Sequence, residues 1–247
     1  MNKALLVVIG SCLLLISCNQ NNPQQIVDKA IAAAGGELYL NSTIEFDFRG
    51  RHYVANRKGG KFSYERIFKN DKDSTQLIHD FVNNEGFRRT INDTLVEVPD
   101  TMKVKYTASV NSVLYFALLP YGLNDPSVKK KWLGETELQG NPYYKIEITF
   151  QQDGGGEDFE DTFIYWIDKS DYTIGYLAYS FQEDGKADCR FRKSINPRVV
   201  DGVRFSDYIN YTPKETKPIA EMETLYKSDA LKELSKIENT NLVVRKN

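Results

Sequence analysis

Histidine and cysteine, which carry much of enzyme and metal chemistry, are scarce in this sequence. The 247 residues include two histidines, His52 and His79, and three cysteines. Two histidines cannot form a three-histidine zinc site, although either could join carboxylates. No G-x-S-x-G, H-E-x-x-H, C-x-x-C or phosphate-loop motif occurs. The sequence therefore predicts no metal site, no cofactor and no catalytic residue.

Strong net charge and long apolar runs are also missing. The formal net charge is −2, which argues against a nucleic-acid partner because nucleic acid requires a basic surface. The apolar run Ala4–Ile16 is shorter than the roughly 20 residues that a helix needs to span a bilayer. Lys3 precedes this run, so the segment is typical of a signal peptide.

The apolar run ends in Leu15-Ile16-Ser17-Cys18, which resembles the bacterial lipoprotein box. The resemblance implies that residues 1–17 are removed as a signal peptide and that Cys18 is acylated, for example with palmitate, and anchors the chain in a membrane. The alternative is an ordinary secretory signal with a chance cysteine. Residues 18–22 would form a tether of roughly 15–20 Å when extended, which keeps the folded body close to the membrane.

The only cysteine beyond the tether is Cys189. A single cysteine cannot form an internal disulfide. No histidine is near it in sequence, so we expect a packed strand residue and not a nucleophile.

Most of the remaining chain alternates apolar and polar residues with a period of two, which is typical of strands with one buried face. Ile44, Phe46 and Phe48 share one strand face, and Tyr144 and Ile146 share another. Short turns rich in Gly, Asn and Asp separate the strands. Strands joined in this way predict an antiparallel meander.

Two helices are expected. The first spans residues 23–34, with Asn22 as the N-cap and Gly35 as the stop. The second, at about 106–118, has apolar residues at helical spacing and ends before Pro120. We expect this apolar helix to lie inside the curve of the sheet.

The predicted fold class is therefore mainly β (α+β). It is a curved antiparallel sheet or incomplete β-barrel, with an N-terminal helix and a central helix packed on the concave face. Residues 23–247 are predicted to form one domain because no linker divides them. Near the end, residues 221–227 are expected to form a strand and residues 228–237 a short helix.

The stretch Phe150–Lys169 contains three consecutive glycines followed by acids. A phosphate site is excluded, because acids repel phosphate and no helix pattern follows. A calcium loop would need acids at defined spacing, which are absent here. The simplest interpretation is a long hairpin loop between two strands.

Three segments, "VNSVLYFALLPYGLNDPSVKKKWLGE", "NPYYKIEITFQQDGGGEDFEDTFIYWID" and "NPRVVDGVRFSDYINY", resemble a family of Bacteroidota lipoproteins of unknown function. The predicted layout also resembles the LolA/LolB-like lipoprotein carriers, whose incomplete barrels enclose an apolar cavity. These resemblances imply a location in the cell envelope. The tether lacks the acids that usually mark surface export in Bacteroidota lipoproteins, which favours an outer-membrane anchor facing the periplasm.

The favoured function is non-catalytic binding of a lipid or other apolar ligand between the concave face and the central helix. The candidate lining residues were chosen by strand alternation or helical phase. They are Phe46, Phe48, Leu114, Tyr115, Leu118, Tyr144, Ile146 and Trp166.

Two alternatives stay open. One is an envelope hydrolase that uses His52 or His79 with carboxylates. The other is a structural or sensory module that binds an unspecified protein through an exposed sheet edge. In addition, Arg49 with Arg51, and Arg190 with Arg192, share strand faces and could hold an anionic headgroup, although a solvated outer face is the simpler interpretation.

Overall fold

The computed structural model describes residues 22–153, 159–183 and 186–247. The predicted signal peptide and Cys18 lie outside these residues, and so do Gly154–Asp158 of the glycine-rich stretch. Its described flanks lead from one strand to its antiparallel neighbour. None of the helices in the described ranges is long and apolar enough to cross a membrane.

The described strands form two antiparallel sheets of seven strands each. The first sheet comprises, in spatial order, β14 (Thr240–Lys246), β1 (Ser42–Phe48), β2 (Arg51–Lys58), β3 (Lys61–Lys69), β4 (Leu77–Asn83), β5 (Gly86–Ile91) and β6 (Thr94–Val96). The second sheet comprises β13 (Leu231–Ile237), β12 (Val203–Pro213), β11 (Lys186–Val200), β10 (Ile174–Glu183), β9 (Thr162–Asp168), β8 (Asn141–Phe150) and β7 (Val128–Leu138).

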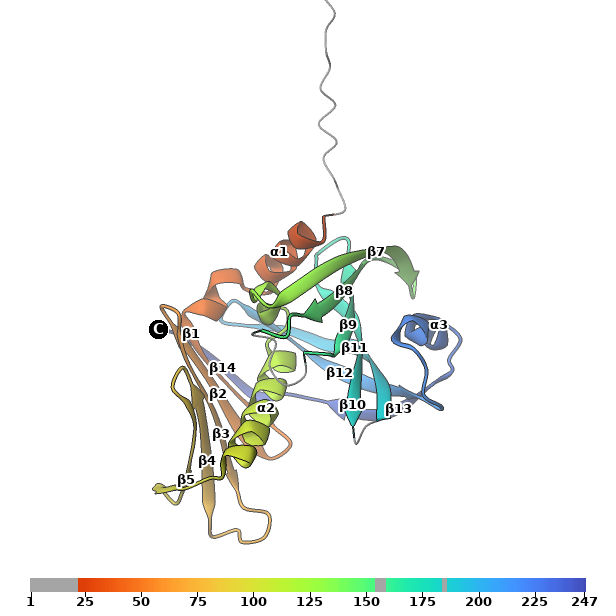
Figure 1. Cartoon of the computed structure of the whole chain (residues 1–247). Coiled ribbons are helices and arrows are strands. Elements are labelled where there is room, and N and C mark those ends of the chain that lie inside the picture. Colours follow the sequence, from red (N-terminus) through yellow and green to blue (C-terminus); the bar gives the residue numbers. More distant parts are fainter. Residues whose placement is uncertain (1–21, 154–158, 184–185) are drawn as a thin grey trace, which may run out of the picture.

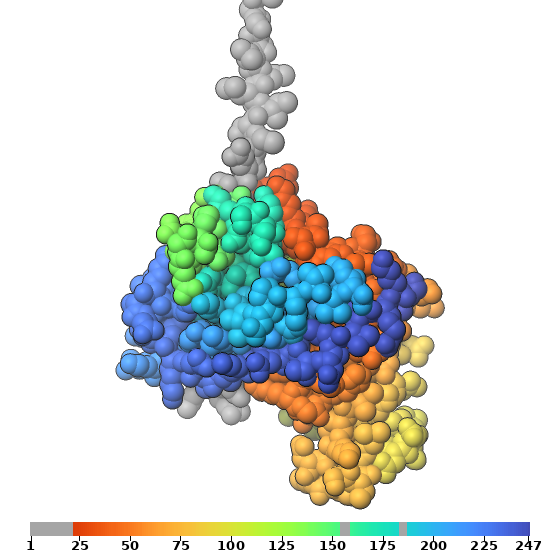
Figure 2. Space-filling view, turned by 180° about the vertical axis from the view of Figure 1, so that it is seen from behind, coloured from red at the N-terminus to blue at the C-terminus, as the bar shows by residue number. Residues whose placement is uncertain are grey.

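The chain crosses between the sheets twice. Helix α2 (Asp100–Ala117) leads from the first sheet to the second, and the short link from β13 to β14 leads back. Seen from behind, the C-terminal residues run as a dark-blue band across the molecule, while the β2–β5 part of the first sheet projects below it (Figure 2). The last strand, β14, covers the edge of β1.

Helix α1 (Pro23–Ala34) is built as its sequence predicts. The Asn22 side chain accepts a hydrogen bond from the Gln24 amide, and Pro23 occupies the first turn. Gly35 ends the helix at φ 132°. A side chain there would be strained, and its Cβ would lie 3.0 Å from the Gly202 carbonyl oxygen.

Helix α2 lies between the two sheets (Figure 1). Val110 and Leu114 are buried in a core shared with Phe46 of the first sheet. On another face of the helix, Tyr115 and Phe116 pack against a core formed by the inner face of the second sheet. The helix therefore contributes to both cores and helps to hold the two sheets together.

A buried ion cluster fastens α2 to the first sheet. Asp80 on β4 is fully buried and accepts hydrogen bonds from Arg66 and Arg89 on the neighbouring strands. Arg66 also donates to Ser109 Oγ of α2 at 2.7 Å, and the Arg89 guanidinium lies 3.8 Å from the ring centre of Tyr106.

The predicted fold class is confirmed, because the structure is mainly β and antiparallel, with an N-terminal helix and a central helix on the inner side of the sheets. The strands divide into two sheets and do not close into a barrel. The central helix begins at Asp100, earlier than predicted, because its exposed first turns carry little apolar signal.

The two elements near the C-terminus are the reverse of those predicted. Residues 222–227 form helix α3 (Met222–Lys227), and residues 231–237 form strand β13. Tertiary contacts decide both cases. The side chain of Glu223 binds Lys145 and Trp166 on the second sheet, and β13 pairs with the otherwise open edge of β12.

Candidate functional site

A pocket of about 500 Å³ lies between α2, the turn from β1 to β2, and strands β10 to β13. We call it the α2 pocket. It is the kind of space that the sequence predicts between the central helix and the concave face. Its volume falls within the range of roughly 300–1,000 Å³ that is usual for small-molecule sites.

One wall of the α2 pocket is apolar. Val113 and Phe116 come from α2, and Phe48 comes from the end of β1. Leu234 and Ile237 come from β13, and Leu234 is 50% exposed. An exposed leucine beside a pocket offers apolar surface to any ligand that enters.

Another part of the lining is polar, and the strand register builds it. Arg192 on β11 pairs with Asn210 on β12, and Asn210 pairs with Ser235 on β13. These three side chains line the pocket as one row. Arg192 and Asn210 are each only 7% exposed.

The polar atoms of this row are incompletely satisfied. Arg192 donates one hydrogen bond, from Nη2 to Tyr179 Oη at 2.8 Å, and its guanidinium lies 3.9 Å from the ring centre of Phe116. Within the described part of the chain, Arg192 Nε and Asn210 Oδ1 have no hydrogen-bond partner. Buried polar groups are rarely left in this state.

Tyrosines near the pocket stay neutral. Burial raises the pKa of Tyr208, which lines the pocket, to about 12, although the nearby arginines oppose this. Deeper in the layer, Tyr115 and Tyr165 share a hydrogen bond of 2.8 Å between α2 and β9. Burial raises the pKa of both phenols. Among the described residues, the charged side chains that line the pocket are Arg49 and Arg192, and no acid or lysine lines it.

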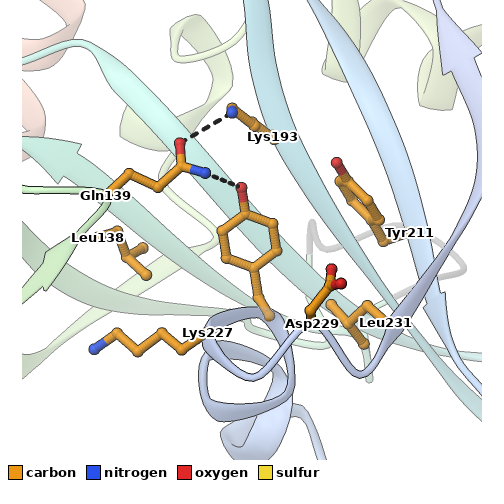
Figure 3. Close-up of a pocket in the computed structure, with 8 residues that line it drawn as sticks. Leu138, Gln139, Lys193, Tyr211, Lys227, Asp229 and Leu231 are labelled. Carbon is orange, nitrogen blue, oxygen red and sulfur yellow. Dashed lines mark hydrogen bonds between the residues drawn. The ribbon is translucent and has the colours of Figure 1, made fainter.

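A second pocket, of about 430 Å³, lies beside α3 on the other side of the second sheet. Figure 3 shows the Gln139 amide bound to two of its neighbours. It accepts from Lys193 Nζ at 3.0 Å and donates to Tyr226 Oη at 3.1 Å. These polar groups satisfy one another, whereas those of the α2 pocket do not. The α2 pocket is therefore the better candidate site.

The structure separates the predicted lining residues. Phe48 lines the α2 pocket. Phe46, Leu114 and Leu118 are buried in the core between α2 and the first sheet. None of these three lines the α2 pocket, although Phe48, Val113 and Ala117 connect their core to it.

The remaining predicted lining residues belong to the second sheet or face it. Tyr144, Ile146 and Tyr115 belong to the core on its inner face. Trp166 lies on the opposite face under α3, where its indole donates to Glu223 at 3.1 Å. The sequence named Arg192 with Arg190 as a pair that could hold an anionic headgroup but favoured a solvated face, whereas Arg192 is buried. It did not single out Asn210 as a lining residue.

The two histidines each lie beside a carboxylate on the outer face of the first sheet. His52 Nδ1 lies 2.7 Å from Asp47 Oδ1, and His79 Nε2 lies 2.8 Å from Glu65 Oε2. Neither histidine lines either pocket. Across residues 22–153, 159–183 and 186–247, no three His, Cys, Asp or Glu side chains are grouped to hold a metal ion.

Cys189 is packed within the second sheet. It is 4% exposed and belongs to the core beneath α3. Burial raises the pKa of its thiol to about 11, with a further contribution from Asp188. The thiol is therefore protonated at neutral pH, which suits a structural residue.

Comparisons with solved structures place similar layouts in several bacterial proteins. A LolA superfamily protein from Nitrosomonas europaea is 12% identical, with a TM-score of 0.48 over 91% of this chain and 94% of that one. A DUF1329 family protein from Desulfovibrio piger is 8% identical, with a TM-score of 0.47 over 90% and 92%. A putative outer membrane lipoprotein-sorting protein domain from Vibrio parahaemolyticus is 10% identical, with a TM-score of 0.46 over 91% and 94%.

At these identities, no residue role transfers from those proteins to this chain. A comparison with curated protein sequences found no match. One family profile, described as a family of unknown function (DUF6503), matches residues 3–239. Because this match spans nearly the whole sequence, the chain belongs to the family of unknown function DUF6503.

Proposed function

We propose that this chain is a membrane-anchored envelope lipoprotein that binds a lipid or other apolar ligand in the α2 pocket, without catalysis. The observation that carries the proposal is the pocket itself, whose apolar wall combines side chains from α2, β1 and β13. Burial of a ligand chain there is favourable by roughly 0.8 kcal/mol for each methylene.

The anchor is proposed from the Leu15–Cys18 motif. Acylated Cys18 would hold the chain at the outer membrane, facing the periplasm, with α1 following directly after the tether. Metabolic labelling with a palmitate analogue tests this proposal. The full-length chain should incorporate the label and sediment with membranes, and Cys18→Ser should do neither. Labelling of Cys18→Ser to the same extent would reject the anchor.

The ligand proposal is tested on the chain from Asn19 to Asn247, which retains every residue that the structure describes. The protein is purified without detergent and extracted with organic solvent, and the extract is analysed by mass spectrometry. A stoichiometric lipid is the expected result. A protein that is empty, and whose melting temperature does not change with added lipids, would refute the proposal.

A matched pair of variants locates the binding site. Ser112 is an exposed residue of α2 that lines the pocket, and its neighbour Asn111 is exposed but does not line it. Ser112→Trp should fill the pocket and lower lipid occupancy several-fold, because the indole competes for the same space. Asn111→Trp should leave occupancy unchanged. Equal occupancy in both variants would place the ligand elsewhere.

A further inference from the structure

We infer that the ligand of the α2 pocket carries an anionic end group, a carboxylate or a phosphate, which binds Arg192 with the help of Asn210 and Arg49. The inference rests on the proposed function and specifies the chemistry of the ligand. It would make the site selective for charged amphiphiles over neutral lipids.

The first observation is the state of Arg192. Two other arginines of low or partial exposure face a carboxylate: buried Arg66 binds Asp80 at 2.6 Å, and half-buried Arg198 binds Asp207 at 2.9 Å. Arg192 is 7% exposed, and within the described residues it has no ion pair. A buried cation without a counter-charge is costly, and an anion in the pocket would remove that cost.

Arg57 provides a useful contrast. It is also buried, and it has no acid partner among the residues that the structure describes. Both arginines are stacked on aromatic rings, Arg57 on Tyr64 and Tyr121, but Arg57 lines neither pocket. Arg192 differs because its guanidinium forms part of the wall of a space that a ligand can enter.

The second observation is the neighbour of Arg192 in the row. Asn210 lines the pocket, and its Oδ1 is buried without a hydrogen-bond partner in the described structure. A rotation of its amide by 180° would present two N–H donors at the same position. Arg192 Nε is also buried and unpartnered, so both side chains keep hydrogen-bonding capacity that the acceptor oxygens of a carboxylate or phosphate would use once the side chains turn towards the pocket.

The third observation is the charge of the lining. Arg49 lies in the turn after β1, is exposed, and stacks on Phe48 at 5.1 Å. Asp207 precedes the lining residue Tyr208 but does not itself line the pocket. Its carboxylate already accepts hydrogen bonds from Arg198 and, at 3.0 Å, from the backbone N–H of Asn239. Both charged lining residues are thus cations, which attract an anion and repel a cationic headgroup.

Apolar side chains line the same space as the arginines. Phe48, Val113 and Leu234 offer a surface for an alkyl chain, while Arg192 and its row offer a site for its charged end. A pocket whose lining combines cations with apolar side chains fits an amphiphile better than a free anion or a neutral hydrocarbon.

The test measures binding of four probes to the chain from Asn19 to Asn247 by calorimetric titration. The probes are dodecanoate, dodecyl phosphate, dodecanol and inorganic phosphate. We expect at least one anionic amphiphile to bind roughly 10- to 100-fold more tightly than dodecanol. Arg192→Gln should remove that difference. Arg190→Gln, on the same strand face but paired with Asp188 outside the pocket, should preserve it.

Each outcome decides a separate point. Equal affinity for dodecanol and the anionic amphiphiles would overturn the anionic end group while leaving the apolar pocket. Binding of neither would overturn the proposed function. Inorganic phosphate that binds as tightly as dodecyl phosphate, and depends on Arg192, would support the anion site and reject the apolar ligand. The preference of the unsubstituted chain decides the inference even if Arg192→Gln does not fold.

Discussion

Replacing Asp80 by Asn should destabilise this protein more than any surface substitution, because it leaves two buried arginines without their counter-charge. Asp80 is 0% exposed, and its side-chain partners Arg66 and Arg89 are 3% and 12% exposed. Asn keeps the shape of the carboxylate and removes its charge, so the change tests electrostatics with little effect on packing.

The magnitude follows from the contacts. Asp80 accepts four hydrogen bonds from the two guanidinium groups, at 2.5 to 3.0 Å. Breaking a buried ion pair by removing one partner typically costs about 3–5 kcal/mol. The free energy of unfolding of a natural domain is typically about 5–15 kcal/mol. Asp80→Asn should therefore remove a large part of the free energy of unfolding of this protein.

The assay is urea unfolding followed by circular dichroism, with the free energy of unfolding obtained by linear extrapolation. Asp71→Asn is the control, because Asp71 is 85% exposed and lies 3.6 Å from Arg51. That pair should contribute about 1 kcal/mol or less. Because Arg66 also binds Ser109, Asp80→Asn should increase hydrogen exchange in α2 as well.

A second variant separates charge from packing. Replacing Asp80 by Leu together with Arg66→Met and Arg89→Met exchanges the ion cluster for apolar groups, and such exchanges are often neutral or stabilising. We expect it to be more stable than Asp80→Asn. A free energy of unfolding for Asp80→Asn within about 1 kcal/mol of the unsubstituted chain would refute the reasoning.

Two further predictions concern the side of the second sheet that α3 covers. Burial raises the pKa of Glu223, but hydrogen bonds from Lys145, Lys227, Thr136 and Trp166 outweigh it and lower the pKa from 4.5 to about 2. A carboxyl whose pKa is lower in the folded chain stabilises the fold above about pH 4.5, and this stabilisation is lost as the pH falls towards 2. Its contribution to the free energy of unfolding is at most roughly 3 kcal/mol. In urea unfolding, Glu223→Gln should therefore have a lower free energy of unfolding than the unsubstituted chain at pH 7, and the two values should converge near pH 2. Glu221→Gln is the control, because Glu221 is exposed and its replacement should change little. A difference between Glu223→Gln and the unsubstituted chain that stays constant from pH 7 to pH 2 would contradict the lowered pKa. The second prediction concerns Cys189 in the chain that begins at Asn19. At pH 8, its alkylation should be roughly 100-fold slower in the folded chain than in the chain unfolded in guanidinium, because burial raises the pKa of the thiol to about 11. Mass spectrometry measures both rates, and comparable rates would show that the thiol is accessible in the folded chain.

Local sequence chemistry accounts for several elements of the fold. Asn22, Pro23 and Gly35 determine both ends of α1, because capping and helix termination depend on residues that are adjacent in the chain. Alternation likewise places Ile44 and Phe46 together on the buried face of β1. These elements were predicted correctly because the interactions that define them are short-range.

Other elements depend on distant partners. Strand β7 has three consecutive lysines after its first residue, Val128, and shows little alternation in its sequence. Strand β14 is formed by pairing with β1, at the other end of the chain. Residues 222–227 alternate like a strand, yet they form a helix because Glu223 binds groups on β8 and β9. Local propensity is a weak predictor where such contacts contribute more.

The sequence by itself determined an antiparallel, mainly β chain with an N-terminal and a central helix, and its N-terminal motif predicts the anchor. Only the tertiary structure decided which strand faces enclose the site. A period of two shows which side chains share a face, but not what covers that face. Trp166 therefore lies beneath α3, away from Ile146, while Arg192 and Asn210, from strands paired in register, lie side by side in the α2 pocket.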